Sequence, residues 1–367
     1  MAFLLPKGLI KEIDRRLRTF LWNGTTASRY PKVAWEFMCR PLEESGQGIR
    51  DVLALNRALM SRHLWSVISH DRTFIWVDWI THYRLRDKSV WTVGYGGSFS
   101  LWHDQWHCLG PLILAFPRGP QLTQTAPHDF LNVVIDNGSW RWPLITNIAC
   151  LEITRLLPPI HHGNDSITWT THGRAFTTKT AYDLFRPSGP KVGWYSLLLG
   201  PFKIPRNSFI LWLAILERLS TLDKPWLSHI DGACILCDSG SSETHNHLFF
   251  ACSYARHCIS TIRTHIRFAW PYMEWQRGVT WATARWRGNH IVNAAYRSLL
   301  ASLVYHIWQE RNRRRFQAIN RPPSIVASIV IEEVKQRILS TSLRISVSTQ
   351  GLYRLWHIPW PVEGNAN

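Results

Sequence analysis

Apolar residues recur at three- and four-residue spacing along much of the chain, which is the pattern of amphipathic helices. Residues 6–22 place their apolar side chains on one helical stripe and their lysines and arginines on the other faces. Asn23 and Gly24 follow directly and are residues that commonly end a helix. Asp51 stands where it can cap a second helix that carries Val52 and the leucines after it. The N-terminal region is therefore predicted to be helical.

The same periodicity returns in the second half of the chain. Asn207 or Ser208 can cap a helix whose apolar positions are spaced by three and four residues. Residues 291–317 predict one long helix, and a last helix is expected near residues 324–339. Residues 74–83 fit a helix or a strand, because their periodicity does not decide between the two.

In one segment apolar and polar residues alternate instead, which is the pattern of a β-strand. Between residues 166 and 185, Ile167 and Trp169 alternate with polar neighbours, and the His-Gly pair at 172–173 offers a turn. Thr180 can then start a helix. The segment is predicted to form a β-hairpin that leads into a helix.

The stretch CILCDSGSSETHNHLFFAC, residues 234–252, combines side chains that bind zinc. Cys234 and Cys237 form a CxxC pair, whose tight turn can aim two thiolates at one ion. His247 and Cys252 can fill the two remaining positions of a tetrahedron. Because four protein ligands leave no position for water, the predicted zinc is structural rather than catalytic.

Two alternatives stay open at this point. His245 lies two residues before His247 and is a competing ligand, and the thiols and the imidazole could be ordinary core residues. An ideal α-helix would also point His247 and Cys252 about 140° apart. Both can bind one ion only if this segment is a helix start or a distorted turn.

The cysteine count and the N-terminal sequence bear on the compartment. Seven cysteines are an odd number at low density, and the first residues carry no apolar segment of the kind found in secretory signals. The longest strongly apolar run, residues 209–216, is too short to span a membrane. We expect an intracellular protein, in the nucleus or the cytoplasm, with reduced thiols and no disulfide framework.

The Cys/His motif and its neighbours, FTTKTAYDLF (176–185) and IPRNSFILWLAILERLSTLDK (204–224), resemble one known domain. It is the zinc-binding domain that follows the polymerase in plant non-LTR (LINE-type) retrotransposon reverse transcriptases. In this resemblance Glu243 and Thr244 fill the Glu-Ser position of the family. The zinc ligands that it implies are Cys234, Cys237, His247 and Cys252.

The resemblance extends outward from the zinc motif. Three segments, residues 5–24, 32–65 and 100–112, resemble the region between polymerase and zinc domain, and IWQERNRRRF (307–316) resembles the helix beyond the zinc domain. The polymerase signature is missing, since no two aspartates are adjacent, and a segment near residues 90–98 looks deleted. The resemblance therefore implies a truncated fragment of a retroelement protein that is not an enzyme.

These patterns together predict a mainly α fold with a small β-hairpin. A helical N-terminal region, a compact zinc-binding domain and a helical C-terminal region are expected. The predicted regions are a helical region over 1–106, an irregular linker over 107–165, the zinc-binding domain over 166–265 and a basic helical region over 266–367.

Charge indicates the partner. The net charge is +17, and residues 253–367 alone carry an excess of eleven positive charges. Arginine suits phosphate through bidentate contacts, so RNA or DNA is the expected partner. The predicted contact residues are Arg311, Arg313, Arg314 and Arg315. Arg311 continues the apolar stripe of its helix and is the weaker candidate, and a merely solvated helix face is the alternative.

Two classes of function are compatible with these observations. The first is a zinc-stabilised nucleic-acid-binding fragment of a reverse-transcriptase polyprotein. The second is a structural or protein-interaction remnant of a decayed retroelement, whose basic surface only keeps it in solution. Neither class involves a small-molecule substrate or a membrane.

Overall fold

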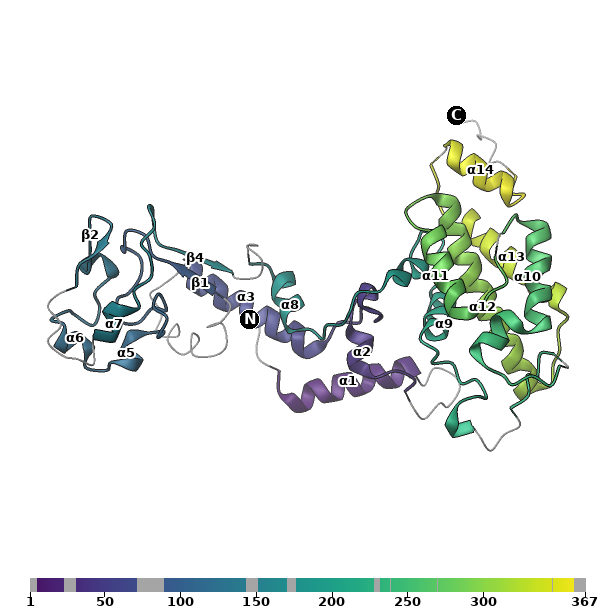
Figure 1. Cartoon of the computed structure of the whole chain (residues 1–367), viewed down its shortest axis with the longest axis horizontal. Coiled ribbons are helices and arrows are strands. Elements are labelled where there is room, and N and C mark those ends of the chain that lie inside the picture. The colour runs from purple at the N-terminus through teal and green to yellow at the C-terminus, as the bar shows by residue number, and fades with distance from the viewer. Residues whose placement is uncertain are drawn as a thin grey trace, which may run out of the picture. The chain divides into compact units, whose positions relative to one another are not determined.

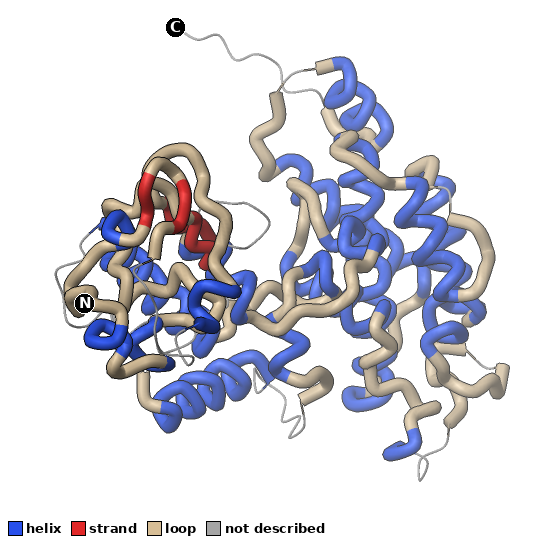
Figure 2. Tube along the Cα trace, turned by 60° about the vertical axis from the view of Figure 1, so that its left-hand side comes forward, coloured by secondary structure: helices blue, strands red, loops and turns tan. Residues whose placement is uncertain are grey.

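The computed structural model describes residues 5–22, 31–70, 89–142, 151–169, 176–227, 232–237, 239–268, 270–344 and 346–359. The chain is mainly helical, and these residues contain two small two-stranded sheets, as the sequence predicted (Figures 1 and 2). The chain divides into two compact units. The first comprises residues 1–20 and 50–186, and the second comprises residues 21–49 and 187–367.

The predicted N-terminal helices are present. Helix α1 (Lys7–Trp22) covers the expected range, and Asn23 and Gly24 lie outside the described residues, as does the segment 74–83. Helix α3 (Val52–His70) begins directly after Asp51. The Asp51 carboxylate accepts a hydrogen bond from the Ala54 amide at 2.7 Å, which confirms the predicted cap.

Helix α8 (Thr178–Phe185) begins two residues earlier than the sequence suggested. Its cap is Thr177, whose side chain accepts a hydrogen bond from the Thr180 amide, while the Thr180 side chain accepts from the Thr177 amide. Thr180 is therefore the third helical residue of a capping box and does not start the helix. The helix packs on α3 through two fully buried alanines, Ala58 and Ala181.

The predicted hairpin is described only in its first strand, because its turn at residues 172–173 lies outside the described residues. Strand β4 (Ser166–Trp169) pairs antiparallel with β1 (Ser89–Thr92), with Ser89 opposite Trp169. The partner that the structure shows for β4 is thus a strand distant in sequence. Asp165 stabilises the loop after β1, because its carboxylate accepts from the amides of Gly94, Gly96 and Ser98 at 2.7–2.9 Å.

The tight hairpin of the first unit lies elsewhere. It joins β2 (Ile135–Asp136) to β3 (Ser139–Trp140) through Asn137 and Gly138, which both have positive φ angles, 48° and 75°. Two left-handed residues of the Asn-Gly type form the turn that matches the twist of a two-residue hairpin.

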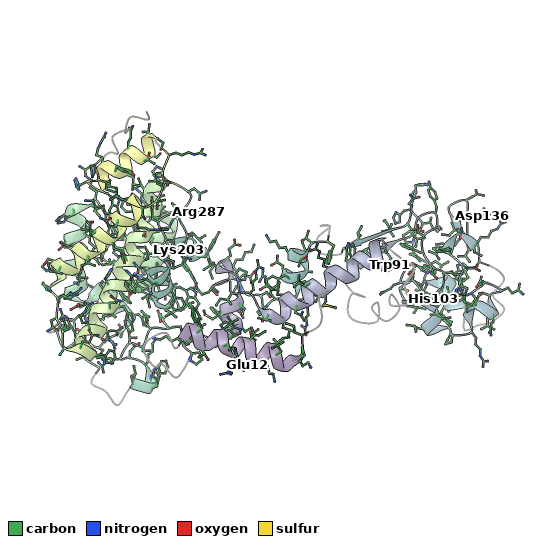
Figure 3. The ribbon with its side chains drawn as sticks, turned by 180° about the vertical axis from the view of Figure 1, so that it is seen from behind. Glu12, Trp91, His103, Asp136, Lys203 and Arg287 are labelled. Carbon is green, nitrogen blue, oxygen red and sulfur yellow. The ribbon has the colours of Figure 1, made fainter. Side chains whose placement is uncertain are left out.

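Strand β1 contributes an aromatic contact to the first unit. Trp91 of β1, labelled in Figure 3, packs against Phe99 with ring centroids 5.0 Å apart.

The segment 107–165 was expected to be an irregular linker, and its described part contributes to an apolar core. Besides β2 and β3 it carries α5 (Leu112–Ala115), α6 (Gly119–Leu122), the 3-10 turn Leu131–Val133 and α7 (Leu151–Arg155). These elements are too short to give a helical or strand period, so the sequence pattern does not reveal the core. The buried residues are Val93, Phe99, Leu101, Trp102, Trp106, Leu112, Leu131, Val134 and Ile153.

The second unit is a helical assembly around one long helix (Figure 1). Helices α12 (Ile291–Gln317) and α13 (Pro323–Leu339) match the two predicted C-terminal helices. Helix α12 packs against α9 and α13, and α13 also packs against α10. The other elements are α2 (Trp35–Cys39), α9 (Pro205–Ile215), α10 (Ser253–His265), α11 (Trp275–Arg285), α14 (Val347–Leu355), the π-turn η7 (His247–Ala251), and the 3-10 turns Leu42–Glu44, Gly193–Leu198 and Pro225–Leu227. None of the helices in the described ranges has the length and apolar character to cross a membrane.

The predicted cap of α9 is wrong. The helix begins at Pro205, a residue whose fixed φ suits the first helical position, and Ile204 precedes it as the cap. Asn207 and Ser208 lie in the first turn and are buried. The Asn207 amide donates to the Glu333 carboxylate at 2.6 Å, so tertiary contact rather than capping accounts for its place.

Candidate metal centre

The four side chains of the predicted zinc motif converge in the second unit. The ligand atoms of Cys234, Cys237, His247 and Cys252 all lie within 4.8 Å of one another. The sulfurs of Cys234 and Cys252 are 4.0 Å apart, and the Cys237 sulfur lies 3.3 Å from Nε2 of His247. In a tetrahedral site with Zn–S near 2.3 Å, neighbouring sulfurs are about 3.8 Å apart. The donor set and its spacing therefore fit a single zinc ion.

The CxxC pair sits in a loop closed by backbone hydrogen bonds. The Cys234 amide donates to the Ser241 carbonyl at 2.9 Å, and the Glu243 amide donates to the Gly232 carbonyl at 2.8 Å. These bonds bring the two sides of the loop together next to the cysteines. Gly240 has a φ of 66°, a conformation that favours glycine, and it lets the polar loop turn back.

A π-turn brings the other two ligands to the same side. The turn η7 runs from His247 to Ala251, and the Cys252 amide donates to the His247 carbonyl at 2.7 Å. A bond between residues five apart widens the turn, so side chains at this spacing face one direction. Thr244 accepts a hydrogen bond from the His247 amide at 3.0 Å and fixes the start of the turn. Of the two conformations that would let both residues bind one ion, a helix start or a distorted turn, the structure has the distorted turn.

The structure also separates the two candidate histidines. His245 is 4% exposed and its Nδ1 lies 3.1 Å from the Thr221 hydroxyl, within the core rather than among the cysteines. Burial, together with the nearby Lys224 charge, lowers the pKa of His245 to about 4. His247, and not His245, is the histidine that the fold places at the sulfurs.

Burial and a hydrogen bond between two of the cysteines set the protonation of the cluster. Desolvation lowers the pKa of His247, which favours the neutral imidazole that binds metal ions. The Cys234 thiol donates to the Cys252 sulfur, and this hydrogen bond raises the pKa of Cys234 and lowers that of Cys252. Because metal binding requires thiolates, a metal must displace the Cys234 proton, and acid should weaken binding.

An ion pair ties the loop of the metal centre to helix α12. The Arg311 guanidinium donates to Glu243 twice through Nε, at 3.0 and 3.1 Å, and once through Nη2, at 2.7 Å. Both side chains are buried, with 3% and 0% exposure. Arg311 also donates to the Ser220 carbonyl and stacks on the Trp308 ring at 4.9 Å. Glu243 thus joins the zinc motif to a helix distant in sequence.

Arg314 makes a second connection, directly to the CxxC turn. Its Nη1 donates to the carbonyls of Ile235 and Leu236 at 3.4 and 3.3 Å, between the two cysteines. Its Nε donates to Glu310, whose side chain is fully buried, and its guanidinium lies over the Tyr254 ring. Arg314 therefore orients the backbone that carries Cys234 and Cys237.

The arginine patch predicted to bind nucleic acid is mostly turned inward. Arg311 is buried, Arg314 contacts the metal loop, and Arg313 donates to Glu310 at 2.8 Å. Arg315 is partly exposed and makes no hydrogen bond or ion pair with the described residues. The pairing of Arg311 has no local signal, because its partner Glu243 lies 68 residues away. The pairing of Arg313 and Arg314 could have been predicted, since Glu310 stands three and four residues before them.

Comparison with known families supports the centre. Residues 176–258 match the family described as zinc-binding in reverse transcriptase. The resemblance to reverse transcriptases is confirmed. The matched range contains all four converging side chains, and it also contains Glu243 and Thr244, the residues that hold the loop and the π-turn.

A longer relative extends the comparison. The chain is 25% identical over 282 residues to a protein of Arabidopsis thaliana whose name describes it as a candidate ribonuclease H protein. The match covers 65% of this chain and 45% of the relative, so the chain spans less than half of that protein's length. No solved structure matches the chain.

Proposed function

We propose that the chain is a zinc-stabilised, nucleic-acid-binding fragment of a plant LINE-type retrotransposon reverse transcriptase. The observation that carries the proposal is the convergence of three cysteines and one histidine within 4.8 Å. A zinc ion bound there would close four positions and hold a loop, a π-turn and the start of α10 together. The centre would then support the fold and leave chemistry to other parts of a longer polyprotein.

Nucleic acid is the partner that the charge favours. The chain carries 42 lysines and arginines against 25 acidic residues, and arginines dominate after residue 253. Arginine-rich surfaces bind phosphate backbones with little sequence preference and with strong dependence on salt. Both RNA and DNA meet this description. The six described cysteines are free thiols, which suits a place inside the cell, in the nucleus or the cytoplasm.

The proposed fragment has no catalytic activity of its own. Polymerases and nucleases that use two metal ions need clustered carboxylates, and this sequence has no adjacent aspartates. The ribonuclease H activity that the name of the Arabidopsis relative suggests is accordingly not part of the proposal. A truncated fragment would depend on other segments for catalysis.

A second candidate is favoured by one specific observation. Three of the four arginines of the predicted patch serve internal contacts, which suits a structural or protein-interaction remnant as well as a nucleic-acid binder. In that case the positive charge would keep the protein in solution without a dedicated partner.

Two measurements on the purified full chain test the proposal. Elemental analysis should find one zinc per folded chain, and binding of a short labelled RNA should weaken steeply as salt rises. Folded protein with substantially less than one zinc would refute the metal site. Binding that is absent even at low salt would favour the remnant.

A further inference from the structure

Two exposed arginines of α10 each place their guanidinium group over the ring of the same exposed tyrosine. The guanidinium carbon of Arg256 lies 5.8 Å from the ring centroid of Tyr272, and that of Arg263 lies 5.7 Å from the same centroid. The arginines are seven residues apart, close to two helical turns, so they lie on one face of α10. Tyr272 keeps 54% of its surface exposed. The ring therefore holds two cations together at the surface of the second unit.

The face around them is hollowed and carries hydrogen-bonding groups. A hollow of about 400 Å³ is lined by Arg256, His257, Ser260, Thr261, Thr264 and Tyr272. Thr261 and Thr264 already donate to helix carbonyls. Nε of Arg256 donates to the Phe250 carbonyl at 3.1 Å, which fixes its guanidinium and leaves the two Nη groups for a ligand.

The local charge is almost entirely positive. Residues 253–290 contain six arginines and one acidic residue, Glu274, and all six arginines are exposed. Glu274 lies 3.9 Å from Arg277. Within the described ranges no carboxylate pairs with Arg256 or Arg263. Two like charges held beside one ring repel each other, and an anion that binds between them would relieve that repulsion.

We propose that Arg256, Arg263 and Tyr272 form a phosphate-binding site for a strand of RNA or DNA. This inference rests on the proposed function and moves its contact surface from α12 to α10. Guanidinium groups bind phosphate through paired N–H donors, and an aromatic ring beside them is typical of surfaces that bind single strands. The predicted patch on α12 offers less to a phosphate, because three of its four arginines are paired with the buried carboxylates of Glu243 and Glu310.

The test compares two charge-matched double variants of the zinc-loaded full chain. Arg256→Gln with Arg263→Gln removes the site, while Arg285→Gln with Arg287→Gln removes two exposed arginines elsewhere; Arg287 is labelled in Figure 3. Binding is measured by fluorescence anisotropy at several salt concentrations. The probes are a labelled single-stranded RNA of mixed sequence, the same sequence as single-stranded DNA, and the corresponding DNA duplex. Comparison of the three affinities shows which kind of nucleic acid the site binds.

The site variant should lower the magnitude of the slope of log K against log salt by about 1.4 on single strands and about 1.8 on duplex. The control pair should change it by less than half as much. Arg263→Gln alone, which breaks no hydrogen bond among the described residues, should lower the magnitude of the single-strand slope by about 0.7. Equal losses in both double variants, or no loss in either, would overturn the site while leaving the proposed function in place. A wild-type chain that binds none of the probes would overturn both.

Discussion

The Arg311 guanidinium and the Glu243 carboxylate form a buried pair, with Nη2 and Oε1 2.7 Å apart. Glu243 lies in the loop that joins the two halves of the zinc motif, and Arg311 lies in the last third of α12. The pair therefore links the metal centre to the central helix. Since both charges are removed from water, each depends on the other for compensation.

Removal of either partner should be strongly destabilising. Arg311→Ala or Glu243→Gln leaves the other polar group buried and uncompensated, and the free energy of unfolding should fall by about 3–5 kcal/mol. The measurement is chemical denaturation of the zinc-loaded protein. As a control, Arg315→Ala should change the free energy of unfolding by less than about 0.5 kcal/mol, because that side chain makes no hydrogen bond or ion pair with the described residues. Equal small effects in all three variants would show that the buried pair does not stabilise the fold.

The two histidines of the motif should behave differently. His247→Ala removes one of the four converging ligands and should release zinc, while His245→Ala should keep zinc and lower stability only by the loss of a buried side chain. Zinc content and protease sensitivity of residues 200–260 measure the outcome. If His245→Ala releases zinc and His247→Ala retains it, the assignment of the ligand is wrong.

Arg314 should influence metal affinity without touching the metal. Its guanidinium holds the carbonyls between Cys234 and Cys237, so Arg314→Ala should weaken zinc binding by about 10- to 100-fold, as the loss of outer contacts does in other metal sites. Competition with a chromophoric chelator measures this affinity. Arg315→Ala serves as the neighbouring control. Unchanged affinity in Arg314→Ala would mean that the CxxC turn keeps its shape by itself.

The carboxylate of Glu333 in α13 is bonded by side chains of α9 and α12 and should make the free energy of unfolding depend on pH. Burial by itself would raise the pKa of Glu333, but hydrogen bonds from His306, Ser302, Arg206 and Asn207 lower it to about 2. The folded pKa lies below the ordinary value, so these bonds stabilise the fold above about pH 4.5 and are lost as pH falls from there towards about 2.

Glu333→Gln should therefore reduce the free energy of unfolding at neutral pH by about 1–3 kcal/mol, and the difference from wild type should shrink below about pH 4.5. Glu332→Gln is the matched control, since Glu332 is exposed and bonds only to Gln336 in the described structure. A difference between Glu333→Gln and wild type that stays constant down to pH 2 would contradict the lowered pKa.

The isolated chain should have no polymerase, nuclease or ribonuclease H activity. The reason is the lack of adjacent aspartates in a sequence with only 25 acidic residues. Primer extension and RNA–DNA hybrid cleavage, with contaminating enzymes excluded by parallel purification of the His247→Ala variant, test this expectation. Activity that is present in the wild type and follows the protein through purification would refute it.

The sequence by itself determined the features that depend on local spacing. The three- and four-residue period of residues 291–317 predicted α12 to the residue, and Asp51 predicted the start of α3. The spacing of Cys234, Cys237, His247 and Cys252 predicted the metal cluster, because a short loop and a turn suffice to bring them together. Such features are encoded within a few turns of the chain.

Only the tertiary structure decided which way individual side chains face. His245 and His247 are equivalent as donors, and the π-turn together with the contact to Thr221 separates them. Strand β4 pairs with β1, a strand more than seventy residues earlier that no local pattern identifies as its partner. The arginines of α12 resemble a basic surface in sequence, but a buried carboxylate 68 residues away draws Arg311 inward. The free energy of pairing a buried charge depends on groups that are distant along the chain, and no local sequence pattern indicates which groups these are.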